Sequence, residues 1–169
     1  MATHVPEAEK REHVRKLIAD FETAMLVTRT PEGAVRARPL SIAEKTGDGV
    51  LYFSTAIESG KVHDLEHDGH AAVVMQSTGR YLSLSGDAHI QRDRALIQQL
   101  WSESWRVWFP EGPSDPSLCL VVFEPHEADY WDAAGAAGLK YLFEMAKAYV
   151  TNTRPGSDGD ERHTGHVKL

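Results

Sequence analysis

The sequence has only one cysteine, Cys119, among its 169 residues. A single cysteine excludes an internal disulfide and leaves no partner for a CxxC redox or zinc motif. Because Cys119 lies within the apolar run LCLVVF, we interpret it as a small buried hydrophobic residue.

Long apolar stretches and clustered basic residues are also missing. No run approaches the roughly 18 apolar residues that a membrane helix needs, and the N-terminal MATHVPEAEKREHVRKL has no apolar segment of the signal-peptide kind. The 18 Lys and Arg residues are scattered against 25 Asp and Glu, for a formal net charge of -7. We therefore expect a soluble, cytoplasmic protein that binds neither membranes nor nucleic acid.

Familiar catalytic motifs are absent as well. The chain has no G-x-S-x-G elbow, no G-x-x-x-x-G-K-[ST] phosphate loop and no G-x-G-x-x-G dinucleotide motif. His63, His67 and His70 have a spacing that could bind zinc, but Asp64 stands where the H-E-x-x-H motif has its glutamate. We interpret these histidines as a solvated helix face, predict no metal site and assign no catalytic residue.

What the chain does have is a succession of short apolar runs bounded by Pro, Gly and Asp. At 169 residues with 41% hydrophobic content it fits a single domain, with a core over 10–150 and a polar tail over 151–169 that we interpret as a loop or loose arm. Helical spacing predicts helices over 6–21, 59–68, 93–108 and about 138–149. Six strands separate them, which predicts a mainly β fold: a small six-stranded barrel with peripheral helices.

The segment STAIESGKVHDLEHDG, residues 54–69, places hydroxyl side chains and a lysine where a strand ends and a helix begins. Ser59 can serve as the N-cap of a helix whose inner face carries Val62 and Leu65. The first amides of a helix attract anions, and Lys61 and Thr55 add a charge and a hydroxyl. This donor set suits a phosphate monoester, although a simple cap with a solvated lysine is the commoner arrangement.

A second source of positive charge lies in VRARPL. Arg36 and Arg38 are two residues apart in a predicted strand and therefore share one face, where guanidinium groups could grip phosphate oxygens. The alternative is a pair of surface arginines on an edge strand.

Three tryptophans, Trp101, Trp105 and Trp108, follow one another at spacings of four and three residues. A helix would align them on one face, which is typical of a core or dimer contact. The alternative is a wall of a ligand pocket, with Trp108 as the main contributor.

Several of these segments together resemble a known family: TPEGAVRARPL, LYFSTAIESGKVHDLEHD, RYLSLSGDAHI, LWSESWRVWFPEGPSDPSLCLVVFEPHEADYWD and KYLFEMAKAYVT. From about residue 10 onward the chain resembles the general stress protein branch of the pyridoxamine 5'-phosphate oxidase-like, FMN-binding split-barrel family. The resemblance implies a six-stranded split barrel that pairs as a homodimer, with two FMN molecules at the interface.

The resemblance also implies roles for individual residues. Arg38, Pro39 and Leu40 match the strand beside the flavin, while Thr55, Ser59, Gly60 and Lys61 match the phosphate-binding segment. Gln76 matches a polar position near the flavin ring, and Trp131 matches an aromatic position that reaches the flavin from the partner subunit.

The sequence departs from the oxidases of this family after Trp131. The segment DAAGAAGLKYLFEMAK follows, with no RLHDR-like substrate-binding sequence, so we do not expect pyridoxamine 5'-phosphate oxidation. The favoured function is an FMN-dependent oxidoreductase acting on an unidentified small molecule, with NAD(P)H as a candidate electron donor. The alternatives are a non-catalytic protein that stores or senses FMN or FAD, and a barrel that has lost flavin and binds another phosphorylated ligand.

Overall fold

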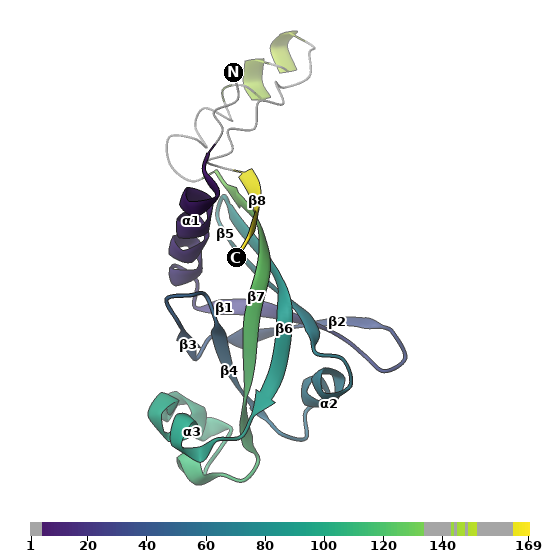
Figure 1. The fold of residues 1–169 in the computed structure, drawn as a ribbon, viewed down its shortest axis with the longest axis vertical. Helices are drawn as coiled ribbons and strands as arrows, with labels where there is room; N and C mark the ends of the chain where they lie inside the picture. The colour runs from purple at the N-terminus through teal and green to yellow at the C-terminus, as the bar shows by residue number, and fades with distance from the viewer. Residues whose placement is uncertain (1–4, 134–142, 144, 148, 152–163) are drawn as a thin grey trace.

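A strongly curled antiparallel sheet forms the body of the protein (Figure 1). The computed structural model describes residues 5–133, 143, 145–147, 149–151 and 164–169. Its elements in chain order are α1 (Glu7–Ala19), β1 (Thr23–Arg29), β2 (Val35–Ser41), β3 (Glu44–Lys45), β4 (Leu51–Ala56), α2 (Gly60–His67), β5 (His70–Ser77), β6 (Arg80–Gln91), α3 (Arg94–Leu100), the 3-10 helices η1 (Glu103–Val107) and η2 (Gly112–Ser114), β7 (Leu118–Asp132) and β8 (Thr164–Lys168).

The strands follow the order β2-β1-β5-β6-β7-β4-β3, and β8 adds to β7. With 15 residues, β7 is long enough to pair with β6 on one edge, and on the other edge with β4 near its start and β8 near its end. The prediction of a mainly β split barrel with peripheral helices is therefore confirmed. Among the described residues the sheet has eight strands instead of the expected six, because the two-residue β3 and the C-terminal β8 were not anticipated.

The register between β6 and β7 shifts between Ser85 and Gly86, which leaves His126 on β7 as the extra residue of a β-bulge that bends its strand. A Cβ on Gly86 would lie 2.0 Å from the carbonyl oxygen of Glu124 and 2.9 Å from the Cα of Pro125. Only glycine allows the two backbones to approach this closely. The bulge is thus one of the points at which the sheet curls.

The core lies inside the curled sheet, and α1 covers one end of it (Figure 1). Strand alternation and the inner face of α1 bury a continuous set of apolar side chains that includes Val14, Leu17, Ile18, Leu26, Phe53, Leu82 and Phe123. A smaller cluster joins α3 and the loop after it to the start of β7 through Ile97, Phe109, Leu118 and Leu120.

The predicted helix over 93–108 is wrong in its second half. Asp93 caps α3 by accepting hydrogen bonds from the amides of Ala95 and Leu96, but the helix ends at Leu100. Trp101 is the C-cap of α3 with non-helical backbone angles, Ser102 is extended, and η1 begins at Glu103. The serine-rich sequence WSES is a poor helix former, because serine hydroxyls compete for backbone hydrogen bonds.

The interpretation of residues 151–169 as a loop or loose arm is wrong for the last residues. Thr164–Lys168 form β8, which pairs with β7 from Glu127 to Trp131 and buries Val167 at 1% exposure. Within the predicted helix over 138–149, residues 143, 145–147 and 149 are helical, and the remaining positions lie outside the described residues. In the part of the chain that the structure describes, no helix is long and apolar enough to cross a membrane.

Candidate functional site

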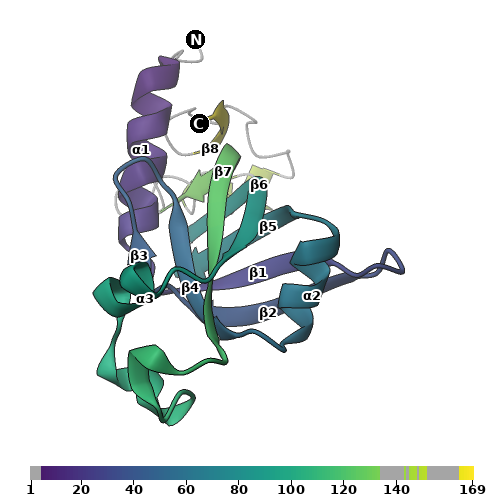
Figure 2. The same cartoon turned by 60° about the horizontal axis from the view of Figure 1, so that its bottom comes forward.

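The candidate site lies where β4 ends and α2 begins, at the end of the molecule opposite to β8 (Figure 1). Thr55 is the buried residue near the end of β4, and its neighbour across the sheet is Cys119 on β7. Figure 2 shows α2 lying beside β1 and β2, so residues from three strands meet at the start of this helix.

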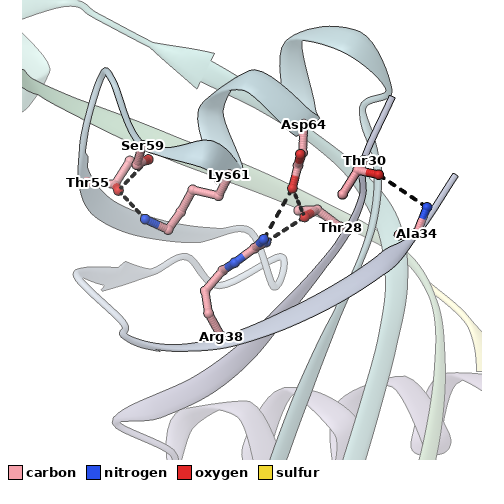
Figure 3. Close-up of polar contacts among 8 residues, drawn as sticks. All are labelled: Thr28, Thr30, Ala34, Arg38, Thr55, Ser59, Lys61 and Asp64. Carbon is pink, nitrogen blue, oxygen red and sulfur yellow. Dashed lines mark hydrogen bonds and ion pairs between the residues drawn. The ribbon is translucent and has the colours of Figure 1, made fainter. Parts of the chain in front are cut away.

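Lys61 and the two hydroxyl residues before it form one cluster (Figure 3). The ammonium of Lys61 donates a hydrogen bond from Nζ to Thr55 Oγ1 at 2.8 Å, and Thr55 Oγ1 lies 3.3 Å from Ser59 Oγ. The three residues that the sequence predicted to share a phosphate site therefore lie together. The turn joins them because Thr55 and Lys61 are only six positions apart around a strand-to-helix corner.

Ser59 occupies the N-cap position with extended backbone angles, as predicted, but its side chain does not cap the helix. Its carbonyl oxygen instead accepts the amide of Val62 at 2.9 Å. Within the described part of the chain the amides of Gly60 and Lys61 donate to no protein acceptor. A Cβ on Gly60 would meet nothing within 4 Å, so the helix start borders open space on that side.

Arg38 reaches the same corner from β2, where it forms a network with Thr28 and Asp64 (Figure 3). Its Nη1 donates to Thr28 Oγ1 at 2.5 Å, and its Nη2 lies 3.2 Å from Asp64 Oδ2. Thr28 in turn donates from Oγ1 to Asp64 Oδ2 at 2.7 Å. Arg38 is thus held by a buried carboxylate, whereas Arg36 on the same strand is exposed.

The two cations of the corner influence each other. Partial burial lowers the pKa of Lys61, and the positive charge of Arg38 lowers that pKa further. Two positive groups, two hydroxyls and two outward-facing amides can together bind an anion with several oxygens, such as a phosphate monoester.

Asp64 and Thr28 were not identified as site residues from the sequence. A signal was nevertheless available, because each is a polar residue on a face that is otherwise apolar. Asp64 lies between Val62 and Leu65 on the inner side of α2, and Thr28 continues the alternation of buried residues in β1. A buried polar side chain in such a position needs a hydrogen-bonding partner.

The neighbours of Arg38 on β2 have different environments. Leu40 faces the main core and packs against it, whereas Pro39 is exposed and lies opposite Met25 on β1. Pro39 has no amide hydrogen to donate to a neighbouring strand. This is tolerated because β2 is an edge strand with a neighbour on one side only. Since successive side chains of a strand point to opposite faces, Pro39 lies on the face of β2 opposite to that of Arg38.

Gln76 and Trp131 lie away from this corner. Both are exposed, and the register places Gln76 opposite Tyr81 and Tyr81 opposite Trp131. Along β7, the step from Cys119, beside Thr55, to Trp131 spans roughly 40 Å of strand. Within one chain the structure does not bring Trp131 to the cluster around Lys61.

The tryptophans of the α3–η1 region do not form one stripe. Trp101 and Trp105 pack edge to face with ring centroids 5.7 Å apart against the smaller cluster. Trp108 follows η1 and is 78% exposed. The expected alignment of all three residues on one helix face is therefore wrong.

The remaining candidates for chemistry lie apart from the cluster or are buried. His70 pairs with Asp68, which raises the pKa of the imidazole. The described residues contain no group of three or more His, Cys, Asp or Glu side chains placed to hold a metal ion. Burial raises the pKa of the Cys119 thiol to about 11, so Cys119 is a protonated, buried thiol at neutral pH.

Comparison with known proteins identifies the family. Residues 9–156 match the family described as pyridoxamine 5'-phosphate oxidase like. The protein bli-3 of Neurospora crassa is 29% identical over 140 residues, which are 76% of this chain and 67% of bli-3.

Solved structures agree with this assignment. A protein from Jannaschia sp. CCS1, proposed to be a general stress protein 26, superposes with a TM-score of 0.66 at 25% identity and covers 96% of this chain and 98% of its own. The general stress FMN/FAD binding protein of Xanthomonas citri superposes with a TM-score of 0.65 at 24% identity, covering 76% of this chain and 92% of its own. The chain therefore belongs to the pyridoxamine 5'-phosphate oxidase-like family and shares its split-barrel fold with solved proteins named as general stress proteins.

Proposed function

We propose that this protein binds FMN and holds the FMN phosphate at the corner between β4 and α2. We call this group of Thr55, Ser59, Lys61 and Arg38 the phosphate corner. The observation that carries the proposal is the convergence of Lys61 and Arg38, from different elements, beside two hydroxyls and two outward-facing amides. Flavin binding by similar general stress proteins supports it.

The chemistry of the corner fits a phosphate monoester better than a carboxylate or a neutral ligand. A phosphate dianion has three terminal oxygens, and the corner offers donors from the ammonium, the guanidinium, the hydroxyls and the backbone. Burial and the positive charge of Arg38 both lower the pKa of Lys61, and among the described residues no carboxylate pairs with its ammonium, which donates to the Thr55 hydroxyl. A dianion would supply that charge.

We further propose that the protein is a homodimer in which the partner subunit completes the flavin site. Trp131 and Gln76 lie too far from the phosphate corner to act there within one chain, but a second copy could bring its own Trp131 to the flavin ring. An exposed Trp108 could cover the same ring from the α3–η1 region.

Flavin, when bound, would supply the redox chemistry, and the chain would anchor the phosphate and shape the space over the ring. We propose an oxidoreductase that acts on a small molecule with NAD(P)H as the electron donor. The second candidate is a protein that stores or senses FMN or FAD without turnover.

The test is a titration of the purified protein with FMN and riboflavin in parallel, followed by addition of NADH or NADPH under nitrogen and then air. We expect FMN to bind much more tightly than riboflavin, and the flavin absorbance to bleach and then recover in air. Tight binding without bleaching would favour storage or sensing. Failure to bind FMN would overturn the proposal and leave a different phosphorylated ligand to be sought.

A further inference from the structure

The carboxylate of Asp64 is the most buried charged group near the phosphate corner. The residue is only 2% exposed, although it belongs to a short helix that lies on the outside of the sheet. A carboxylate is expensive to bury unless it is paired and hydrogen-bonded. An apolar residue between Val62 and Leu65 would pack at this position without that cost, so the carboxylate calls for a further explanation.

The hydrogen bonds around Asp64 run from Arg38 to Thr28 and from both of these residues to the Asp64 carboxylate. Thr28 uses its only hydroxyl hydrogen to donate to Asp64 Oδ2, which leaves its oxygen lone pairs to accept from Arg38 Nη1. Arg38 Nη2 meets the same carboxylate oxygen at 3.2 Å. The two Nη atoms of Arg38 therefore contact two different acceptors, which fixes the plane of the guanidinium as well as its position.

Arg38 needs such support because of its place in the fold. It projects from β2, an edge strand with a neighbour on one side only. A long arginine side chain on an edge strand would otherwise sample many rotamers in water, and ordering it would oppose ligand binding. With two acceptors engaged, the guanidinium still has further N–H groups to offer a ligand, since it has five in total.

We propose that Asp64 is a positioning residue, which acts through Thr28 and directly on Arg38 so that the guanidinium is held ready for the ligand phosphate beside Lys61. The inference rests on the proposed phosphate site. Asp64 itself does not touch the ligand in this arrangement. Its negative charge would by itself repel a phosphate, so its contribution is orientation and not attraction.

Orientation of Arg38 by Asp64 favours phosphate binding, whereas the charge of Asp64 opposes it. The substitution Asp64→Asn shows which effect is larger. If orientation dominates, Asp64→Asn weakens the affinity for FMN by about tenfold, as expected when a charge-assisted contact is lost. The affinity for riboflavin stays unchanged. Thr28→Val should have the same effect, and Thr28→Ser, which keeps the hydroxyl, should restore wild-type affinity. If the carboxylate acted only through its charge, Asp64→Asn would tighten FMN binding, and that result would overturn the proposal.

A control and a background variant separate positioning from general damage. Glu66→Gln removes a carboxylate from the same helix, where Glu66 pairs with Arg92 at the surface, and should leave FMN affinity unchanged. In an Arg38→Ala background, Asp64→Asn should cause no further loss, because there is no guanidinium to position. Equal losses in both backgrounds, or equal losses of FMN and riboflavin, would show a merely structural role.

A measurement on the ligand-free protein keeps the inference distinct from the proposed function. In 15N spectra of the arginine side chains, a guanidinium held at two acceptors rotates slowly about the Nε–Cζ bond and shows separate Nη1 and Nη2 resonances. We expect separate resonances for Arg38 in the wild type and one averaged resonance in Asp64→Asn. Averaged resonances in the wild type would overturn the positioning role, even if FMN binds. Separate resonances in a protein that does not bind FMN would overturn only the proposed ligand.

Discussion

Arg38 on β2 and Lys61 on α2 lie close enough for the positive charge of Arg38 to lower the pKa of Lys61. Residues with like charge usually avoid such proximity unless a ligand or a carboxylate compensates them. Asp64 compensates Arg38 through a 3.2 Å contact, but the ammonium of Lys61 has only the hydroxyl of Thr55 as a partner within the described residues. This imbalance of charge supports the proposal that the corner binds an anion.

Replacing Lys61 with Met should weaken FMN binding by about 1.5–3 kcal/mol, because a charge-assisted hydrogen bond to the phosphate is lost. Riboflavin has no phosphate, so its affinity should not change. Flavin fluorescence titrations of both ligands check this, with Lys45→Met on β3 as a control for loss of a distant charge. Equal weakening of FMN and riboflavin would contradict the assignment of Lys61 to the phosphate.

The affinity for FMN should fall at alkaline pH before an ordinary lysine would deprotonate. In the ligand-free protein, burial and Arg38 lower the pKa of Lys61 below 10.5, and a bound phosphate would raise it again. Binding therefore takes up a proton between these two pKa values, and the affinity decreases as the pH rises through that window. The measurement is the FMN dissociation constant across the alkaline range. Lys61→Arg, which stays charged, should remove most of this pH dependence.

Gly86→Ala should destabilise the protein by about 3 kcal/mol, because the new Cβ would lie 2.0 Å from the Glu124 carbonyl oxygen at the bulge. Gly47→Ala is a matched control, since a Cβ on Gly47 meets nothing within 4 Å. Urea unfolding followed by tryptophan fluorescence compares the two variants. A Gly86→Ala protein as stable as Gly47→Ala would mean that the backbones of β6 and β7 do not approach so closely at the bulge.

Cys119 should react slowly with thiol reagents at pH 8 in the native protein and rapidly in urea. Burial keeps its pKa at about 11, and the thiolate is the reactive form. Since this folded pKa lies above the unfolded value of 9.0, the thiol's contribution to stability is fully present below pH 9 and is lost as the pH rises through about 11. Labelling at the same rate in native and unfolded protein would show that Cys119 is accessible.

The protein should have a molar mass of about twice 18.8 kDa in light scattering. Tyr81 and Trp131 are neighbours across β6 and β7, and both are about half exposed, as expected for a surface that a second copy covers. Replacing both with Glu should produce monomers and weaken flavin binding as well. A wild-type monomer that binds FMN tightly would refute the proposal that the partner completes the site.

The sequence predicted those parts of the site whose residues lie close together along the chain. Thr55, Ser59 and Lys61 were identified together because a single strand-to-helix turn joins them. Strand alternation offered Arg36 and Arg38 equally, and the family resemblance singled out Arg38, although its partner could not be named. Where local propensity was ambiguous, as in the segment around Trp101 and Trp108, the predicted helix was too long.

The sequence by itself determined the pattern of short alternating strands, the amphipathic first helix, the family and the donor-rich turn at Lys61, because each depends on residues close together in the chain. Only the tertiary structure decided that Arg38 meets Asp64 and Thr28, that Thr164–Lys168 completes one edge of β7, and that Trp131 lies far from the phosphate corner. These relationships join residues that are distant in sequence. They arise from the curl of the sheet and from the need to pair buried polar groups, which no local pattern specifies.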